Sequence, residues 1–261
     1  MKIIINGACG RMGKVLFECA NNQKIEIAAR VDAMKHGCDE NGKIYASLSE
    51  IESIKADALI DFSHHSATPD IVSFAKKTHI PCVIATTGHN ESEISMLREL
   101  SKTVPVFVSS NMSLGVNIVI GLCRDAVRRL SGNCDIEIIE KHHRNKLDAP
   151  SGTALMIAKE ISKEMKGKTD FVFDRTNRRC VRPDNEIGIS SVRAGSIFGE
   201  HEIIISTEGE TISIKHTAES RDLFASGALK AASFVCGRES GYYTMEDFLK
   251  SASSASKQET I

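Results

Sequence analysis

The N-terminal segment constrains the fold more than any other part of the chain. An apolar strand candidate, Ile3–Asn6, leads directly into a loop that carries glycine at positions 7, 10 and 13, and a helical pattern, Arg11–Asn22, follows it. Glycine 7 permits a tight turn, glycine 10 allows a ligand to approach the backbone, and glycine 13 allows a helix to pack closely on a strand. Strand, glycine loop and helix in this order predict the first unit of a parallel α/β sheet.

The rest of the first half repeats this alternation of strand and helix. Unbroken apolar runs of this length fit parallel strands that are buried on both faces. We therefore expect an α/β fold with an N-terminal, Rossmann-like, doubly wound parallel sheet. The further strand candidates are Ile25–Asp32, Ala56–Phe62, Pro81–Ala85 and Val104–Val108, and a second helical pattern covers Thr68–Lys77.

The second half has a different pattern, which predicts a smaller α+β domain. Glycines in two connecting segments, Gly199-Glu200 and Gly209-Glu210, suggest turns between antiparallel strands. After these runs the pattern becomes helical again, and the polar tail Ser251–Ile261 is expected to fray. The predicted helices are 113–130, a helix from Ser151, 223–235 and 245–249, and the predicted strands are 135–142, 187–193, 201–206 and 211–216.

The glycine loop and the acid Asp32 together predict a dinucleotide site. Asp32 ends the second strand 25 residues after Gly7, where a carboxylate can bind adenosine-ribose hydroxyls. The alternative is a glycine-rich turn without a ligand. Asp32 favours NADH, whereas the nearby cationic residues would offset its repulsion of the NADPH phosphate, so we expect use of NADH and/or NADPH with a lean towards NADH. The predicted loop contacts are Gly7, Ala8, Cys9, Gly10, Arg11 and Met12, and the offsetting cations are Arg11, Lys35 and His36.

Two further loops follow the fourth and fifth strand candidates. Ligands of open α/β sheets bind outside the carboxyl ends of the strands, so small hydroxyl side chains there can hold the ribose and the nicotinamide amide. The alternative is ordinary loop structure, with Thr87 or Ser113 as a helix cap. The predicted cofactor contacts in these loops are Ala85, Thr86, Thr87, Ser109, Ser110, Asn111 and Met112.

The densest polar run of the chain covers residues 140–154. Its histidine, arginine and lysine side chains follow an apolar strand, and Ser151-Gly152-Thr153 then opens a helix that we expect to be uncapped. Such a helix start binds anions, so cations and an anion cradle together suit a small dicarboxylate substrate. The alternative is a solvated turn in which Ser151 or Thr153 is a plain N-cap. Strand alternation also places His142 and His143 on opposite faces unless the strand ends there.

The composition excludes several classes of protein. The formal net charge is −1 with both signs interspersed, which argues against nucleic acid and membrane-surface partners. The eight cysteines form no CxxC pair and no zinc-finger spacing with histidine, so no metal site is expected. The chain contains no signal-peptide pattern and no apolar run of membrane-spanning length, and we expect a cytoplasmic protein with reduced thiols.

Six stretches spread over nearly the whole chain resemble the 4-hydroxy-tetrahydrodipicolinate reductase family. The most specific is EKHHRNKLDAPSGTAL at 140–155, and the others are GACGRMG at 7–13, ATTG at 85–88, SSNMSLGVN at 109–117, SVRAGSIFGEH at 191–201 and HTAESRDLFASGAL at 216–229. The resemblance implies reduction of 4-hydroxy-tetrahydrodipicolinate with NAD(P)H in diaminopimelate and lysine synthesis. It implies that His142 is a proton donor/acceptor, that Lys146 is a proton donor, and that the substrate carboxylates bind at His143, Ser151, Gly152 and Thr153.

The resemblance also implies an organisation into two domains and a homotetramer. Residues 1–112, completed by 223–261, would bind the dinucleotide, and residues 113–222 would bind substrate and form the tetramer. One departure concerns the cofactor: many members carry an arginine just after the acid of the second strand, where it grips the NADPH phosphate, and this chain has Ala33. That difference supports the lean towards NADH.

Two other classes of protein share parts of these patterns. Another oxidoreductase with this nucleotide domain, such as an amino-acid or semialdehyde dehydrogenase, is the nearest alternative. The semialdehyde type needs a cysteine nucleophile paired with histidine, and no cysteine here stands in an obvious site of that kind. A dinucleotide-sensing module without turnover would need the glycine loop but not the run from His142 to Thr153. Consumption of the dinucleotide, as opposed to binding alone, distinguishes these classes.

Overall fold

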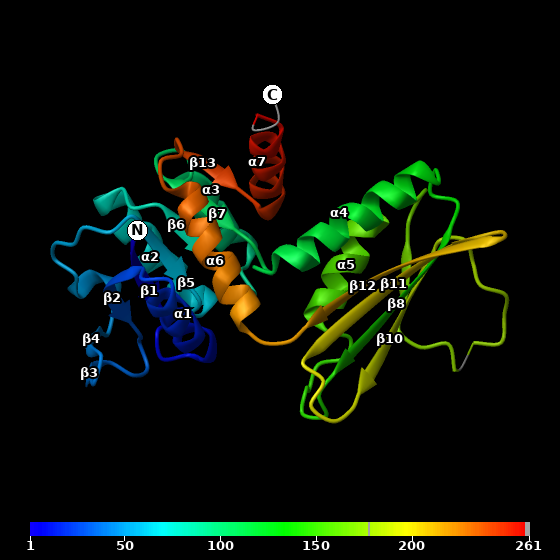
Figure 1. The fold of residues 1–261 in the computed structure, drawn as a ribbon, viewed down its shortest axis with the longest axis horizontal. Helices are drawn as coiled ribbons and strands as arrows, with labels where there is room; N and C mark the ends of the chain where they lie inside the picture. The colour runs from blue at the N-terminus through cyan, green and yellow to red at the C-terminus, as the bar shows by residue number, and fades with distance from the viewer. Residues whose placement is uncertain (177, 259–261) are drawn as a thin grey trace. The chain divides into compact units, whose positions relative to one another are not determined.

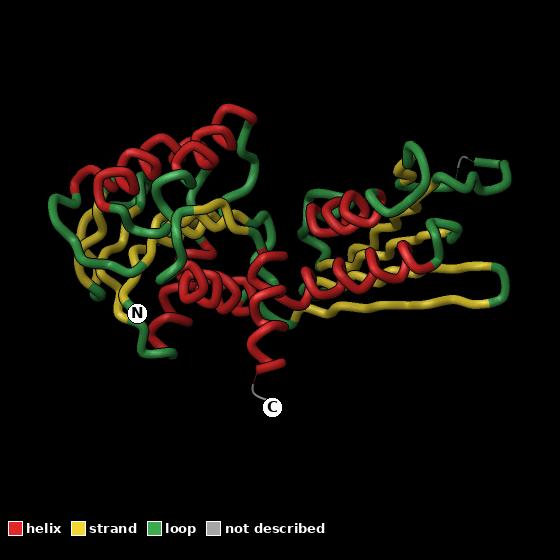
Figure 2. Tube along the Cα trace, turned by 90° about the horizontal axis from the view of Figure 1, so that it is seen from above, coloured by secondary structure: helices red, strands yellow, loops and turns green. Residues whose placement is uncertain are grey.

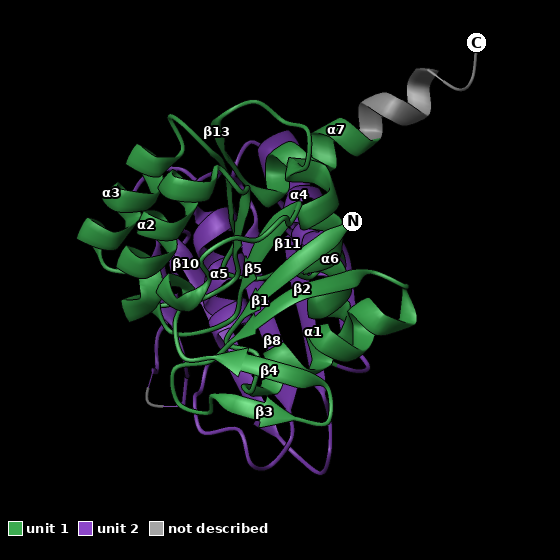
Figure 3. Cartoon of the chain, turned by 90° about the vertical axis from the view of Figure 1, so that its left-hand side faces the viewer, with its two compact units in different colours: residues 1–114, 221–261 green, residues 115–220 purple. Residues whose placement is uncertain are grey.

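A computed structural model describes residues 1–176 and 178–258. The chain forms two compact units, which Figure 3 distinguishes by colour: unit 1 comprises residues 1–114 and 221–261, and unit 2 comprises residues 115–220. Unit 1 contains a large, mostly parallel sheet and unit 2 a smaller mixed sheet (Figure 1). The predicted fold class is therefore confirmed.

The sheet of unit 1 has the strand order β13-β7-β6-β5-β1-β2-β4-β3. Neighbouring strands are parallel except for β3 and β4. The order reverses between β1 and β5, so the crevice for a ligand is expected at the carboxyl edge there. The strands are β1 (Lys2–Asn6), β2 (Glu26–Val31), β3 (Gly37–Asp39), β4 (Gly42–Tyr45), β5 (Ala58–Asp61), β6 (Cys82–Ile84), β7 (Pro105–Val108) and β13 (Gly241–Tyr243).

Alternate residues of the central strands enter two separate cores. Ile3 and Ile5 of β1 pack with α1 (Arg11–Asn22), α6 (Asp222–Val235) and α7 (Met245–Gln258). Ile4 faces the other side, where α2 (Thr68–Thr78) and α3 (Glu91–Leu100) cover the sheet. Figure 2 shows helices on both faces of this sheet. Because both faces are buried, the strands read as continuous apolar runs.

Several elements of unit 1 were not predicted. The helix α3 begins with a capping box, in which the Asn90 side chain accepts from the Glu93 backbone N–H and the Glu93 carboxylate accepts from the Asn90 N–H. Asn90, and not Thr87, therefore caps this helix. The helix α7 runs to Gln258, so the expectation of a frayed tail from Ser251 is wrong up to that residue, and residues 259–261 lie outside the described part. No helix in the described part is long and apolar enough to cross a membrane.

Unit 2 has a five-stranded sheet in the order β12-β11-β8-β10-β9. The helices α4 and α5 bury one of its faces, with Ile136 and Ile138 of β8 in the core between them. The elements are α4 (Leu114–Arg129), β8 (Asp135–His142), α5 (Gly152–Ser162), β9 (Asp170–Val172), β10 (Glu186–Arg193), β11 (Gly199–Thr207) and β12 (Glu210–Ala218).

The expectation of a wholly antiparallel run in this unit is wrong in one respect. The strands β11 and β12 do form an antiparallel hairpin, with Gly209 at positive φ in its turn. The strand β10 instead pairs parallel to β8, which lies between β10 and β11. Gly199-Glu200 belongs to β11 and is not a turn. The error arose because alternation indicates strands without indicating which strands are neighbours.

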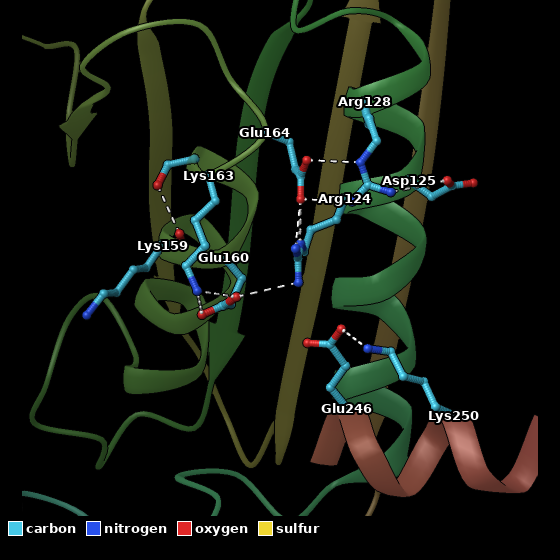
Figure 4. A network of polar contacts seen from close by, with 10 residues as sticks. Arg124, Asp125, Arg128, Lys159, Glu160, Lys163, Glu164, Glu246 and Lys250 are labelled. Carbon is cyan, nitrogen blue, oxygen red and sulfur yellow. Dashed lines mark hydrogen bonds and ion pairs between the residues drawn. The ribbon is translucent and has the colours of Figure 1, made fainter. Parts of the chain in front are cut away.

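A carboxylate following α5 ties the two helices of unit 2 together (Figure 4). Glu164 accepts hydrogen bonds from Arg124 Nε at 2.8 Å and from an Arg128 terminal nitrogen at 2.9 Å. These hydrogen bonds from Arg128 and Arg124 lower the pKa of Glu164 to about 2, so the carboxylate is charged at neutral pH. The network fixes α4 against the C-terminal end of α5.

Candidate active site

The loop after β1 is shaped by two glycines that have no room for a side chain. Gly7 has φ +81°, and a Cβ there would lie 2.6 Å from the Phe62 carbonyl oxygen. A Cβ on Gly13 would lie 2.1 Å from the Gly7 carbonyl oxygen, so α1 can approach β1 this closely only with glycine at that position. These are the backbone requirements that the sequence predicted for glycines 7 and 13.

The N-terminus of α1 has the properties of an anion site. Gly10 is its N-cap, no side chain of the described chain caps the helix, and its first turn contains no acid. The backbone N–H groups and the positive end of the helix dipole are therefore available to a pyrophosphate. The residues between the glycines have different environments: Ala8 and Met12 pack into the core, Cys9 Sγ donates to the Lys35 carbonyl oxygen, and Arg11 is exposed.

The carboxylate of Asp32 holds the glycine loop in place. One oxygen accepts from the Cys9 N–H at 2.9 Å, and the other accepts from the N–H groups of Met34 and Lys35 at 3.0 Å each. Asp32 is 9% exposed, and the open side of the residue lines a pocket. It thus orders two of the loops that surround that pocket.

This pocket, of about 390 Å³, lies at the carboxyl edge of the unit 1 sheet. Gly7 and Gly10 contribute to it after β1, and Asp32 and Ala33 contribute after β2. The other side of the pocket follows β4 and β5 and was not predicted from the sequence. Because ligands bind at the carboxyl ends of parallel strands and β5 was an expected strand, the residues after β5 could have been predicted. The residues that were not predicted on this side are Ala46, Ser47, Leu48, Phe62, Ser63, His64, Ser66, Ala67 and Asp70.

A buried carboxyl group ends β5 beside these residues. Asp61 is 1% exposed and accepts hydrogen bonds from Asn6 Nδ2 at 2.8 Å and from the Ser63 hydroxyl at 2.5 Å. Burial raises its pKa, against the opposing effect of these hydrogen bonds. Asp61 therefore connects the ends of β1 and β5, the two strands between which the strand order reverses.

The two remaining predicted loops follow β6 and β7 at the same edge. Ala85 and Thr86 are nearly buried, and Thr87 is exposed. The loop of Ser109 and Ser110 after β7 is ordered by Asn111, whose side-chain oxygen accepts from the Ser113 N–H at 2.9 Å. The Met112 side chain is 2% exposed and packs in the core, so only its backbone is available to a ligand.

In unit 2, His142 is the last residue of β8 and lies on the inward face of the strand, which Glu140 also occupies. Its Nδ1 lies 2.5 Å from a Glu140 carboxylate oxygen. Its Nε2 makes no hydrogen bond within the described chain and faces Gly199, where a Cβ would lie 3.2 Å away. Burial lowers the pKa of His142, and Glu140 opposes that effect.

Lys146 lies in a tight turn directly after β8. The Lys146 N–H donates to the His143 carbonyl oxygen, and the Arg144 N–H donates to Gly195, which follows β10. The Lys146 ammonium lies 2.8 Å from an Asp148 carboxylate oxygen, and this hydrogen bond lowers the pKa of Asp148. His142 and Lys146 therefore lie at the same end of the sheet. His143 stands outside the strand, so strand alternation no longer separates it from His142.

The expectation that the helix after this loop is uncapped is wrong. Ser151 caps α5, because its hydroxyl accepts from the Ala154 N–H at 3.1 Å. The same hydroxyl lies 2.9 Å from His201 Nε2, and Ser151 is 2% exposed. The other residues of the predicted anion cradle are more open, since Gly152 is exposed and Thr153 half-buried. The first turn of α5 contains no acid.

Comparison with known proteins assigns both halves of the chain. The family model described as dihydrodipicolinate reductase, N-terminus, matches residues 1–112, and the model described as dihydrodipicolinate reductase, C-terminus, matches residues 115–249. The chain belongs to the dihydrodipicolinate reductase family. The resemblance drawn from the six sequence stretches is confirmed.

Relatives of this reductase match it over nearly its whole length. The 4-hydroxy-tetrahydrodipicolinate reductase of Caldanaerobacter subterraneus subsp. tengcongensis is 47% identical, over 96% of this chain and 98% of the relative. The enzyme of the same name from Clostridium novyi is 43% identical over the same shares of the two chains. The protein is accordingly an oxidoreductase of lysine and diaminopimelate biosynthesis that uses NADH or NADPH.

Solved structures support the fold independently. The dipicolinate-bound dihydrodipicolinate reductase from Paenisporosarcina sp. TG-14 has a TM-score of 0.76 with 21% identity, covering 94% of this reductase and 97% of that chain. A myo-inositol dehydrogenase from Corynebacterium glutamicum has a TM-score of 0.57 with 16% identity, covering 95% and 92% of the two chains. The fold is thus shared with other dehydrogenases, so the fold alone does not select the substrate.

Proposed function

We propose that this reductase converts 4-hydroxy-tetrahydrodipicolinate to tetrahydrodipicolinate, with unit 1 holding the dinucleotide and unit 2 the substrate. The observation that carries the proposal is the cluster at the end of β8, where His142, Lys146 and the N-terminus of α5 surround one corner of unit 2. Such a corner combines two proton-carrying groups with an anion site. It suits a small ring that carries two carboxylates.

The residues of unit 1 fit a nicotinamide dinucleotide. The uncapped start of α1 and the side-chain-free surface at Gly7 and Gly10 would hold the pyrophosphate, and Asp32 would bind the adenosine ribose. The loops after β6 and β7 would hold the ribose and amide of the nicotinamide half. When bound, NADH or NADPH supplies the hydride. Ala33 in place of an arginine, beside the charged Asp32, underlies the proposed preference for NADH.

In unit 2, some residues would transfer protons and others would bind the substrate carboxylates. Lys146 would give a proton to the reacting ring and would stabilise negative charge as it develops there. His142 would exchange protons through Nε2, because Nδ1 is already held by Glu140. His143, Gly152 and Thr153 would bind the carboxylates, which fixes the ring and lowers the entropic part of the barrier. We propose that Ser151 contributes by capping α5 and thereby ordering that site.

The alternative of a semialdehyde dehydrogenase receives no support from the cysteines. All eight are free thiols, and burial raises the pKa of Cys9, the one in the glycine loop. A nucleophilic cysteine needs a lowered pKa or an adjacent base. The free thiols also agree with a cytoplasmic location, which we include in the proposal. The proposal further includes a homotetramer built through unit 2.

The test is a coupled assay with purified protein. The substrate is made in situ from pyruvate and aspartate semialdehyde by the upstream synthase, and oxidation of NADH and NADPH is followed in parallel. Oxidation that depends on the synthase is expected, with the higher kcat/KM for NADH. Dinucleotide binding without oxidation would contradict the proposal and would favour a sensing module or another dehydrogenase.

A further inference from the structure

We propose that Glu140 is a positioning residue for His142, held in turn by Arg193. This inference rests on the proposed proton role of His142 and adds two residues that neither the sequence patterns nor the comparisons assign. Glu140 is completely buried near the end of β8, although carboxylates are almost never fully buried unless they are paired. Its position two residues before His142 on the same face of β8 places both side chains at the same corner.

Hydrogen bonds to both oxygens of Glu140 hold its carboxylate in one orientation. One oxygen accepts from an Arg193 terminal nitrogen at 2.7 Å and from the Ser151 N–H at 3.1 Å. The other accepts from the second terminal nitrogen of Arg193 at 2.8 Å and faces His142 Nδ1 at 2.5 Å. This bidentate arginine pair is the geometry that best restrains a carboxylate.

The consequence for His142 is a fixed tautomer. A carboxylate only accepts, so Nδ1 must carry a proton, and in the neutral ring Nε2 is then the acceptor. Nε2 is the nitrogen that has no partner in the described chain and that lies over Gly199. The pair Glu140–His142 therefore presents one defined nitrogen to the substrate corner, ready to take up or release a proton.

Arg193 connects this pair to the lysine loop. One of the two terminal nitrogens of Arg193 that bind Glu140 also donates to the Asp148 carbonyl oxygen at 2.6 Å. The Asp148 carboxylate in turn forms an ion pair with Lys146. Arg193 is the register partner of His142 across β8 and β10, so the sheet itself fixes this placement. One arginine thus sets the relative positions of both groups proposed to carry protons.

The charges around His142 determine how its pKa responds to loss of Glu140. Burial lowers the pKa of His142, Glu140 raises it, and the positive charges of Lys146 and Arg193 lower it. The ring of His201, from β11, packs edge-on against His142 with centroids 5.3 Å apart. Burial lowers the pKa of His201 to about 4, so that ring is neutral at neutral pH. Glu140 is the only one of these neighbours that favours the charged form of His142.

The experiment is a double-mutant cycle in the full-length enzyme with Glu140→Gln, His142→Gln and their combination. Glu140→Gln alone is expected to lower kcat about tenfold or more with little change in NADH affinity. The limb of the kcat–pH profile that disappears in His142→Gln is expected to move to lower pH in Glu140→Gln, because the favourable charge is gone. In the His142→Gln background, Glu140→Gln should cost less than about twofold.

A matched control uses another ion-paired glutamate of the same strand. Glu137 lies on the opposite face of β8 and pairs with Arg182, and Glu137→Gln is expected to leave the pH profile unchanged. The proposal would be overturned if Glu140→Gln lowered kcat by the same factor in the wild type and in the His142→Gln background. It would also be overturned if the limb of the kcat–pH profile did not move in Glu140→Gln. Full turnover in His142→Gln would instead contradict the proton role of His142 itself, and the proposal would fail with it.

A second variant keeps the test decisive if Glu140→Gln does not fold. Glu140→Asp retains the negative charge on a shorter side chain, so Arg193 stays paired while the reach to His142 changes. We expect lower kcat with the pH limb close to that of the wild type. The positioning role would be overturned if the limb of the kcat–pH profile shifted in Glu140→Asp as much as in Glu140→Gln. It would also be overturned if Glu140→Asp lowered kcat by the same factor in the His142→Gln background.

Discussion

At the scale of single residues, the proposed chemistry depends most on Lys146. Its ammonium is held by Asp148, and the loop that carries both residues is anchored through Arg193. Lys146→Ala removes the proposed proton donor without touching unit 1, so turnover should fall by about 10²-fold or more while dinucleotide affinity is kept. Steady-state rates and a fluorescence titration with NADH measure the two quantities.

The control for this variant is a lysine that makes a similar ion pair elsewhere in unit 2. Lys163 pairs with Glu160 at 2.6 Å on the exposed side of α5. Lys163→Ala is expected to keep the wild-type turnover, since exposed pairs contribute little. Unchanged turnover in Lys146→Ala would remove Lys146 from the proposed role.

The cofactor preference is also decided by single residues. Ala33 lines the pocket directly after Asp32, at the position where many members of the family carry the arginine that grips the 2′-phosphate. Ala33→Arg should raise kcat/KM for NADPH relative to NADH by about tenfold or more, because guanidinium binds phosphate bidentately. Ala33→Gln, of similar length and no charge, should leave the ratio unchanged. A strong NADPH preference in the wild type would contradict the reasoning about Asp32.

At the scale of elements, the contact between β1 and α1 should be the least tolerant of change. Gly13→Ala puts a methyl group against the Gly7 carbonyl oxygen, so we expect a loss of about 2 kcal/mol or more in the free energy of unfolding, together with loss of dinucleotide affinity. Urea unfolding and NADH titration test this.

Gly121 provides the opposite case in a helix. It lies inside α4, where a Cβ would have no atom within 4 Å. Gly121→Ala should therefore leave the free energy of unfolding unchanged or raise it by about 0.5–1 kcal/mol, because alanine favours the helix. A large loss in the free energy of unfolding of Gly121→Ala would show that the space around the Cβ does not explain the difference between Gly13 and Gly121.

The elements also show how far a sequence can be interpreted. The strands of the central sheet were predictable because burial on both faces leaves continuous apolar runs, as in Ile3–Asn6. The strands β3 and β4 were not, because they are short and mostly exposed, and β4 joins β2 through only two residue pairs. The parallel pairing of β10 with β8 was missed because neighbours in a sheet are set by tertiary packing.

The candidate site likewise contains residues that the sequence could indicate and residues that only the strand register brings together. The glycine loop, Asp32 and the run from His142 to Thr153 have local signals, namely glycine spacing and clustered charge, so they could be recognised. Arg193 and His201 fall in the family-like stretch 191–201, but each stands alone in an alternating strand, so no clustered charge marked either as a site residue. Only the register of β10 and β11 with β8 brings them to Glu140. Ser151 was placed correctly at a helix start, and its N-cap role, which had been the alternative to an uncapped anion cradle, is the one that the structure shows.

At the scale of the whole molecule, the open face of the unit 2 sheet indicates where copies of this chain would associate. The helices α4 and α5 cover one face, whereas Ile139 and Ile204 are half-buried on the other and Val192 is 39% exposed there. In the described part, β12 also ends the sheet without a further strand neighbour. Ion pairs such as Lys141–Glu200 and Lys215–Glu200 surround these apolar side chains on the same face. An uncovered sheet face with an open edge strand is typical of an interface between subunits.

This face leads to a prediction about assembly. Sedimentation of the wild type should give about four times the 28.5 kDa mass of the chain. Ile204→Lys places a charge in the middle of the open face and should shift the protein to smaller species, whereas Ile94→Lys, on the exposed side of α3, should not. Turnover measured at the same concentrations shows whether the corner around His142 needs the assembly to stay ordered. A wild type that sediments as a single chain would contradict the tetramer, and a tetramer that withstands Ile204→Lys would place the interface on another surface.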